Sequence, residues 1–146
     1  MASIKDRIHK SKDLLGGYLC LIPSAVVTQA LAAAGADWLV IDQEHAPTGM
    51  ENLHAMIAAT AGTSCSPWVR VAKRDEAYVK PALDAGAEGI MFPLVRTAAE
   101  AAECVALTNI RLKAVAAGDR SSRTHVGASS CSTICASAAT RPSAVS

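Results

Sequence analysis

Residues 14–107 alternate between two hydrophobic patterns, and this alternation restricts the fold more than any other feature of the sequence. Short apolar runs, typical of strands buried on both faces, are followed by longer stretches with apolar residues every three or four positions, as in helices. The strand-like runs are residues 18–22, 38–41, 67–71 and 89–93, and the helical stretches are 25–34, 48–61, 75–85 and 97–107. Strict alternation in units of about 20 to 25 residues predicts an α/β fold with a parallel sheet.

Right-handed crossovers make such a sheet either doubly wound or part of a (β/α) barrel. A complete (β/α)₈ barrel takes about 250 residues, whereas this chain has 146. In both architectures the chemistry lies at the carboxyl ends of the strands. The residues that follow each strand-like run are therefore the candidates for a functional site.

Composition excludes several classes of partner. The formal net charge is +1, so the chain lacks the basic excess of a nucleic-acid-binding protein or of a polybasic membrane surface. No apolar run approaches the roughly 18 residues of a membrane span, and residues 1–13 are charged, without the apolar centre of a signal peptide. These features predict a cytoplasmic protein.

The cysteines do not predict a disulfide framework, because five is an odd number and their spacing is irregular. Cys131 and Cys135, with His125 nearby, form an incomplete pattern for a zinc site.

Charged side chains gather where the second and third strands end. Asp42, Glu44 and His45 follow the second strand, and Arg70 ends the third. A neighbouring carboxylate can orient a histidine for proton transfer, and a cation at a strand end suits a carboxylate, a phosphate or an enolate oxygen. The structural alternatives are a histidine that caps the next helix and an arginine in a surface salt bridge. Asp84, late in the third helix, would by itself be a solvated acid.

Three segments resemble one family. Residues 34–47 (AGADWLVIDQEHAP), 67–71 (PWVRV) and 79–93 (VKPALDAGAEGIMFP) are similar to signatures of the HpcH/HpaI aldolases, which are metal-dependent class II pyruvate aldolases. The resemblance covers about residues 14–108 and preserves the order and spacing of the segments. It implies the first four β/α units of a TIM-type (β/α)₈ barrel, and the residues beyond it form an irregular C-terminal tail without the pattern of a strand or helix.

The resemblance also implies an activity and roles for residues. The family makes or breaks the carbon–carbon bond between a pyruvate (2-oxo acid) enolate and an aldehyde, with Mg²⁺, Mn²⁺ or Co²⁺. By motif position His45 is the general base, acting through a water, and Asp84 pairs with it. Arg70 holds the 2-oxo oxygen, and Asp42 and Glu44 support the loop. The resemblance also implies that the intact family forms homo-oligomers.

The sequence departs from the family after Thr108. The metal ligands expected there, a Glu and an Asp in segments similar to QIE and GPxDLS, are absent, as is a loop similar to YPPxGxRG. Shifting the reading frame from Asn109 onward permits Tyr-Pro-Pro-Glu-Gly-Ser-Arg-Gly, which resembles the missing loop. We therefore expect two parts: residues 1–108 as the N-terminal half of a barrel, and residues 109–146 as a disordered tail translated out of frame, without strand or helix.

These observations leave more than one function open. An aldolase chain truncated by a frameshift would be inactive by itself, because the metal ligands are missing. The alternatives are a non-catalytic barrel fragment and a lyase acting on a CoA ester, as in the citrate lyase β type. The EHAP loop at residues 44–47 favours the aldolases of free 2-oxo acids.

Overall fold

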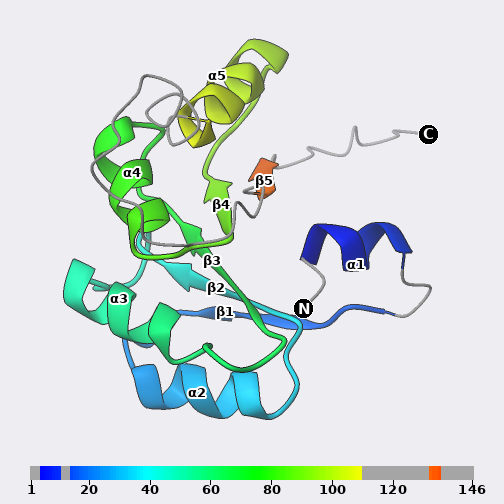
Figure 1. Ribbon diagram of the computed structural model, residues 1–146. Coiled ribbons are helices and arrows are strands. Elements are labelled where there is room, and N and C mark those ends of the chain that lie inside the picture. The colour runs from blue at the N-terminus through cyan, green and yellow to red at the C-terminus, as the bar shows by residue number, and fades with distance from the viewer. Residues whose placement is uncertain (1–3, 11–13, 110–131, 136–146) are drawn as a thin grey trace, which may run out of the picture.

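A computed structural model describes residues 4–10, 14–109 and 132–135 of the chain (Figure 1). Strands and helices alternate along it. The helices are α1 (Ile4–Lys10), α2 (Ala25–Ala33), α3 (Met50–Ala58), α4 (Glu76–Asp84) and α5 (Ala98–Thr108). The strands are β1 (Gly17–Cys20), β2 (Trp38–Asp42), β3 (Ser66–Arg70), β4 (Gly89–Phe92) and β5 (Ser132–Cys135). All strand pairs are parallel and follow chain order, β1-β2-β3-β4-β5, as in consecutive units of a (β/α) barrel.

Local signals explain where the helices begin and end. The hydroxyl of Thr97 and the side chain of Glu100 form a capping box at the start of α5, and Ser24 and Asp75 cap α2 and α4 through their side chains. Gly35 and Gly86 follow the ends of α2 and α4 with φ of 94° and 105°, a left-handed backbone that only glycine adopts without strain.

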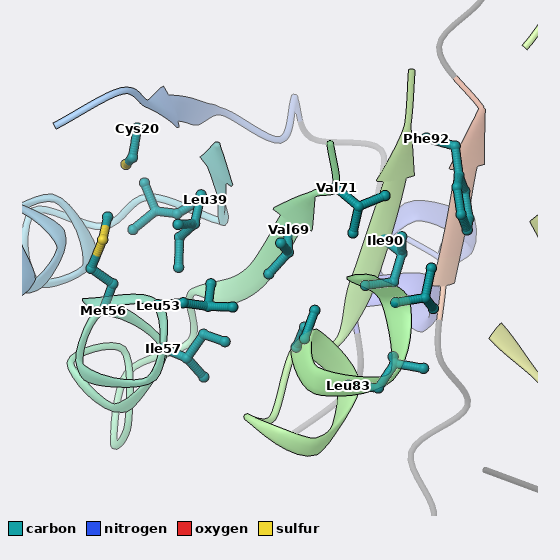
Figure 2. Close-up of a cluster of buried hydrophobic side chains, with 14 of the residues drawn as sticks. Cys20, Leu39, Leu53, Met56, Ile57, Val69, Val71, Leu83, Ile90 and Phe92 are labelled. Carbon is teal, nitrogen blue, oxygen red and sulfur yellow. The ribbon is translucent and has the colours of Figure 1, made fainter. Parts of the chain in front are cut away.

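The two faces of the sheet are covered differently. The outer face carries Leu39, Val69 and Ile90, which pack against Leu53 and Met56 of α3 and Leu83 of α4 in the main hydrophobic core (Figure 2). The inner face carries Val40 and Trp68, and there the short helix α1 packs through its buried residue Ile4. Figure 1 shows α1 on the side of the sheet opposite α2, α3 and α4.

Inner-face residues form layers across the sheet, because the strands are paired in register. Trp38 lies beside Gly17, and Trp68 beside Gly89. A Cβ atom on Gly17 would overlap the Trp38 ring, and one on Gly89 would lie 2.6 Å from the Trp68 ring. The glycines therefore make room for indole rings lying over the neighbouring strand. Above these apolar layers, Asp42 and Arg70 pair at the carboxyl edge.

Two elements were not predicted from the sequence. The charged segment at residues 4–10 forms α1, held by an ion pair from Arg7 to Asp37 and a 3.0 Å hydrogen bond from Arg7 Nη1 to the Ser64 carbonyl. The expectation of no strand after Thr108 is wrong for Ser132–Cys135, which pairs with β4. The free edge of β4 supplies backbone donors and acceptors that a weakly apolar segment can use. The remainder of the predicted out-of-frame tail beyond residue 109 lies outside the described residues.

Candidate active site

Asp42 and Arg70 form the centre of the candidate site. They end the neighbouring strands β2 and β3 and are paired in register on the inner face. Arg70 Nε donates to Asp42 Oδ1 at 2.9 Å, and Nη2 donates to Oδ2 at 2.6 Å. The Asp42 side chain is fully buried, whereas the Arg70 side chain keeps 19% of its surface exposed. The pair is therefore a bidentate, largely desolvated ion pair and not the surface salt bridge that the sequence left open.

Asp42 also shapes the loop after β2. Its Oδ1 accepts hydrogen bonds from the backbone amides of Glu44, at 2.8 Å, and of His45, at 3.3 Å. Gln43, which the sequence did not single out, donates its backbone amide to the Arg70 carbonyl and its side-chain Nε2 to the Thr48 carbonyl. A single buried carboxylate thus fixes both the arginine and the turn that presents His45.

Glu44 and His45 lie beside this pair. Glu44 Oε2 is 3.4 Å from Arg70 Nε and 3.6 Å from His45 Nε2. The second distance exceeds that of a hydrogen bond, so Glu44 influences His45 through its charge. The His45 side chain is 65% exposed and faces solvent at the carboxyl edge. The alternative of a histidine cap is not realised, because α3 begins after Gly49 without any side-chain cap.

Protonation follows from these contacts. Burial by itself raises the pKa of Asp42, but the hydrogen bonds from Arg70 and from the amides of Glu44 and His45 outweigh it, and the pKa lies below its ordinary value. The hydrogen bonds to Asp42 raise the pKa of Arg70. The pair is therefore ionised at neutral pH. Asp42 is bound by Nε and Nη2, which leaves Arg70 Nη1 available to an anionic oxygen.

Asp84 does not join this group within the chain. It is the last residue of α4 and is exposed. The chain then enters the amino end of β4, where the Glu88 amide donates to the Pro67 carbonyl at 2.8 Å. His45 follows the carboxyl end of β2. Strands of four or five residues separate the two edges by roughly 13–17 Å. The predicted contact of Asp84 with His45 is therefore not formed in a single chain.

No group of three or more His, Cys, Asp or Glu side chains in the described part of the chain could hold a metal ion. The carboxylates at the site already have partners: Asp42 accepts hydrogen bonds from Arg70 and two amides, and Glu44 lies 3.4 Å from Arg70 Nε. The residues present therefore do not fit a divalent cation.

Among the helices that the structure describes, none has the length and apolar character that a membrane span requires.

A parallel sheet whose strands follow chain order, each joined to the next by a helix, is the arrangement of consecutive units of a (β/α) barrel. The family model of the HpcH/HpaI aldolase/citrate lyase family matches residues 19–130. The chain belongs to this family, as its three motif segments predicted. Members of the family generally depend on a divalent metal.

Relatives agree with this assignment. A hydroxypyruvate/pyruvate aldolase of Paraburkholderia phytofirmans is 41% identical over 63% of this chain and 34% of its own length. A 4-hydroxy-2-oxo-heptane-1,7-dioate aldolase of Salmonella dublin is 36% identical over 73% of this chain and 40% of its own length. The crystal structure of an HpcH/HpaI family protein from Burkholderia cenocepacia superimposes with a TM-score of 0.68 and 40% identity, over 72% of this chain and 42% of that one. The chain thus spans well under half of each of these relatives.

Proposed function

We propose that this chain carries the 2-oxo acid-binding part of a pyruvate aldolase site, in which an enolate and an aldehyde are joined or separated. The observation that supports the proposal most directly is the Arg70 guanidinium, fixed by Asp42 beside His45 at the carboxyl edge. The relatives' names agree with it. A 4-hydroxy-2-oxo acid, as in the name of the Salmonella relative, is the adduct that a 2-oxo acid enolate forms with an aldehyde.

In the proposed reaction Arg70 binds the C2 oxygen of the 2-oxo acid through the nitrogen that Asp42 leaves free. When the bond between C3 and C4 breaks, negative charge moves onto that oxygen, where the fixed cation stabilises it. His45 accepts the proton of the C4 hydroxyl, through a water, as the aldehyde leaves. His45 then returns this proton, which adds to C3 of the enolate and gives pyruvate. Asp42 and Glu44 act as positioning residues, and Asp84 has no part in the site of a single chain.

The metal is a separate requirement of the proposal. Mg²⁺, Mn²⁺ or Co²⁺ would neutralise charge on the 2-oxo acid, as metal ions do in such sites. Because the described residues do not fit a cation, its ligands have to come from other β/α units. We expect the intact enzyme to act in the cytoplasm, as a homo-oligomer, on a small 2-oxo acid and an aldehyde.

A second candidate follows from that same mismatch between the site and a metal ion. In this second candidate function, the 146-residue chain is a non-catalytic barrel fragment that binds the 2-oxo acid without turnover. This candidate predicts that the purified chain, with Mg²⁺ or Mn²⁺, does not release pyruvate from a 4-hydroxy-2-oxo acid. Turnover by the chain alone would exclude it.

A chimeric barrel tests the main proposal. Residues 14–108 replace the matched segment of the Paraburkholderia aldolase, whose own remaining units complete the barrel. Pyruvate release from a 4-hydroxy-2-oxo acid is followed with a coupled dehydrogenase. We expect turnover that His45→Ala abolishes, whereas Lys80→Ala, an exposed change on α4, leaves it intact. A folded chimera without turnover, or one in which His45→Ala retains full activity, would contradict the proposal.

A further inference from the structure

One carboxylate joins the loops that follow β3 and β4. Glu100 Oε1 accepts a hydrogen bond at 2.8 Å from Nη2 of Arg74, which lies in the loop between β3 and α4. Glu100 Oε2 accepts the backbone amides of Arg96, at 2.7 Å, and of Thr97, at 3.0 Å, where the loop after β4 enters α5. Arg74 is therefore linked through Glu100 to the start of α5.

The ion pair between Arg74 and Glu100 is largely shielded from solvent. The two side chains keep 28% and 27% of their surfaces exposed. The hydrogen bond from the Arg96 amide, followed by the one from Arg74, lowers the pKa of Glu100 below its ordinary value of 4.5. Glu100 is therefore ionised at neutral pH, and its bond to the Arg74 guanidinium is assisted by charge.

Stability alone does not explain this arrangement. The other terminal nitrogen of Arg74, Nη1, is buried and has no hydrogen-bond partner among the described residues. A buried donor without a partner destabilises a folded chain, and an apolar side chain of similar size would avoid that cost. An unsatisfied buried group of this kind therefore calls for a reason other than stability.

The ion pair lies just beyond the strand end that carries Arg70. Asp42 of β2 holds Arg70 from one side. On the other side, Val71 donates its backbone amide to the Met91 carbonyl of β4 at 3.2 Å. Arg74 follows three residues later, and its ion pair continues the attachment of the β3 side to the β4 side beyond the strands.

We propose that Arg74 and Glu100 are positioning residues that act through Arg70. Their ion pair holds the loop after β3 against the start of α5, so the strand end that carries Arg70 is fixed from the side that Asp42 does not reach. The expected effect on turnover rests on the proposed function, whereas the effect on the Arg70 side chain does not.

Solvent exchange of the Arg70 Nε proton tests the positioning directly. This proton lies in the hydrogen bond to Asp42, and NMR of the isotope-labelled 146-residue chain measures its exchange rate. We expect Arg74→Met and Glu100→Gln each to accelerate the exchange about tenfold, because a loosened loop lets the pair open more often. Lys73→Ala removes the neighbouring exposed cation and should leave the rate unchanged.

Kinetics of the chimeric barrel give a second test. Arg74→Met should lower kcat/KM for a 4-hydroxy-2-oxo acid about tenfold, because a misplaced Arg70 binds the reacting oxygen less well. Arg74→Lys, which can still pair with Glu100, should restore most of the loss. In an Arg70→Lys background Arg74→Met should cost little more, since both changes act through the same guanidinium.

Circular dichroism and urea midpoints show which variants fold. If Arg74→Met does not fold, Glu100→Gln takes its place, because glutamine keeps an oxygen for the amides at the start of α5. Unchanged exchange of the Arg70 proton in a folded variant would overturn the proposal, as would losses of kcat/KM that multiply independently in the double variant. A chimera without turnover would instead contradict the proposed function, and the exchange rates would still decide the role of the ion pair.

Discussion

Arg70 donates two hydrogen bonds to Asp42 across neighbouring strands, from Nε to Oδ1 at 2.9 Å and from Nη2 to Oδ2 at 2.6 Å. Strand pairing aligns the two residues at the carboxyl edge, so the sheet itself determines their contact. Asp42 simultaneously accepts the amides of Glu44 and His45. One buried carboxylate therefore couples the stability of the edge to the shape of the site, and this coupling can be measured.

Replacing Asp42 by Asn should destabilise the chain strongly. The substitution removes the bidentate partner of the largely buried Arg70 charge and leaves only Glu44 nearby, and breaking such a pair typically costs about 3 kcal/mol. The free energy of unfolding, from urea titration followed by tryptophan fluorescence, measures the loss. Glu44→Gln is the control, since Glu44 Oε2 lies 3.4 Å from Arg70 Nε and outside the bidentate pair. This variant should lose less than about 1 kcal/mol of unfolding free energy. Equal losses for both variants would contradict the central role of Asp42.

Stability should fall in acid because of Asp42. The pKa of Asp42 is lower in the folded chain than its ordinary value of 3.8, so the unfolded chain binds the proton first. The stabilisation is therefore complete above about pH 5 and is lost as the pH falls through the folded-state pKa. Urea midpoints at pH 7, 5, 4 and 3 should decrease more steeply in the wild type than in Asp42→Asn. Glu100, whose pKa is also lowered, is present in both proteins and cancels in the comparison. Parallel pH profiles would contradict this prediction.

The indole layers on the inner face should not tolerate a methyl group on the adjoining glycine. Gly89→Ala places a carbon 2.6 Å from the Trp68 ring, and such overpacking typically costs about 1–3 kcal/mol. Gly16→Ala is the control, because its Cβ meets nothing within 4 Å. Trp68→Leu should make Gly89→Ala less costly in a double-mutant cycle of unfolding free energies. Additive effects would show that the ring and the glycine do not constrain each other.

Arg70→Lys in the chimeric barrel should weaken both binding and turnover. A lysine cannot hold both oxygens of Asp42 and still offer a directed nitrogen to the 2-oxo acid. We expect a reduction in kcat/KM of about 100-fold, which corresponds to the loss of a charge-assisted hydrogen bond. Steady-state kinetics with a 4-hydroxy-2-oxo acid measures it, and unfolding of the same variant shows whether the barrel remains folded. Unchanged kcat/KM in a folded variant would exclude Arg70 from the site.

Cys65 should be unreactive in the native chain. Burial, followed by smaller effects of nearby charges, raises the pKa of its thiol to about 11, two units above the ordinary value of 9.0. The thiolate fraction at pH 8 is then about 100-fold lower than for a free thiol. Alkylation with iodoacetamide, located by peptide mass spectrometry, should label Cys65 in urea but not in buffer. Rapid labelling in buffer would show that this part of the core opens.

Several features could be predicted from residues 14–108 alone. Apolar runs such as residues 38–41 indicated buried parallel strands, and the glycines after the helices marked where the helices end. Arg70 and His45 could be placed at the same edge because parallel strands present their carboxyl ends together. The family match confirms the resemblance from which their roles were inferred. The roles themselves stay predictions.

The sequence by itself therefore determined the order of the β/α units and the family, and it predicted the edge at which the candidate site lies, because hydrophobic period, turn residues and motifs are local properties of the chain. Only the tertiary structure decided that Asp42 is tied to Arg70, that Asp84 lies at the opposite edge, and that Gly17 and Gly89 accommodate indole rings. Those relationships depend on strand register and on which end of an element a residue occupies. The same is true of α1 and β5, whose sequences are weakly patterned and whose positions depend on contacts with the sheet.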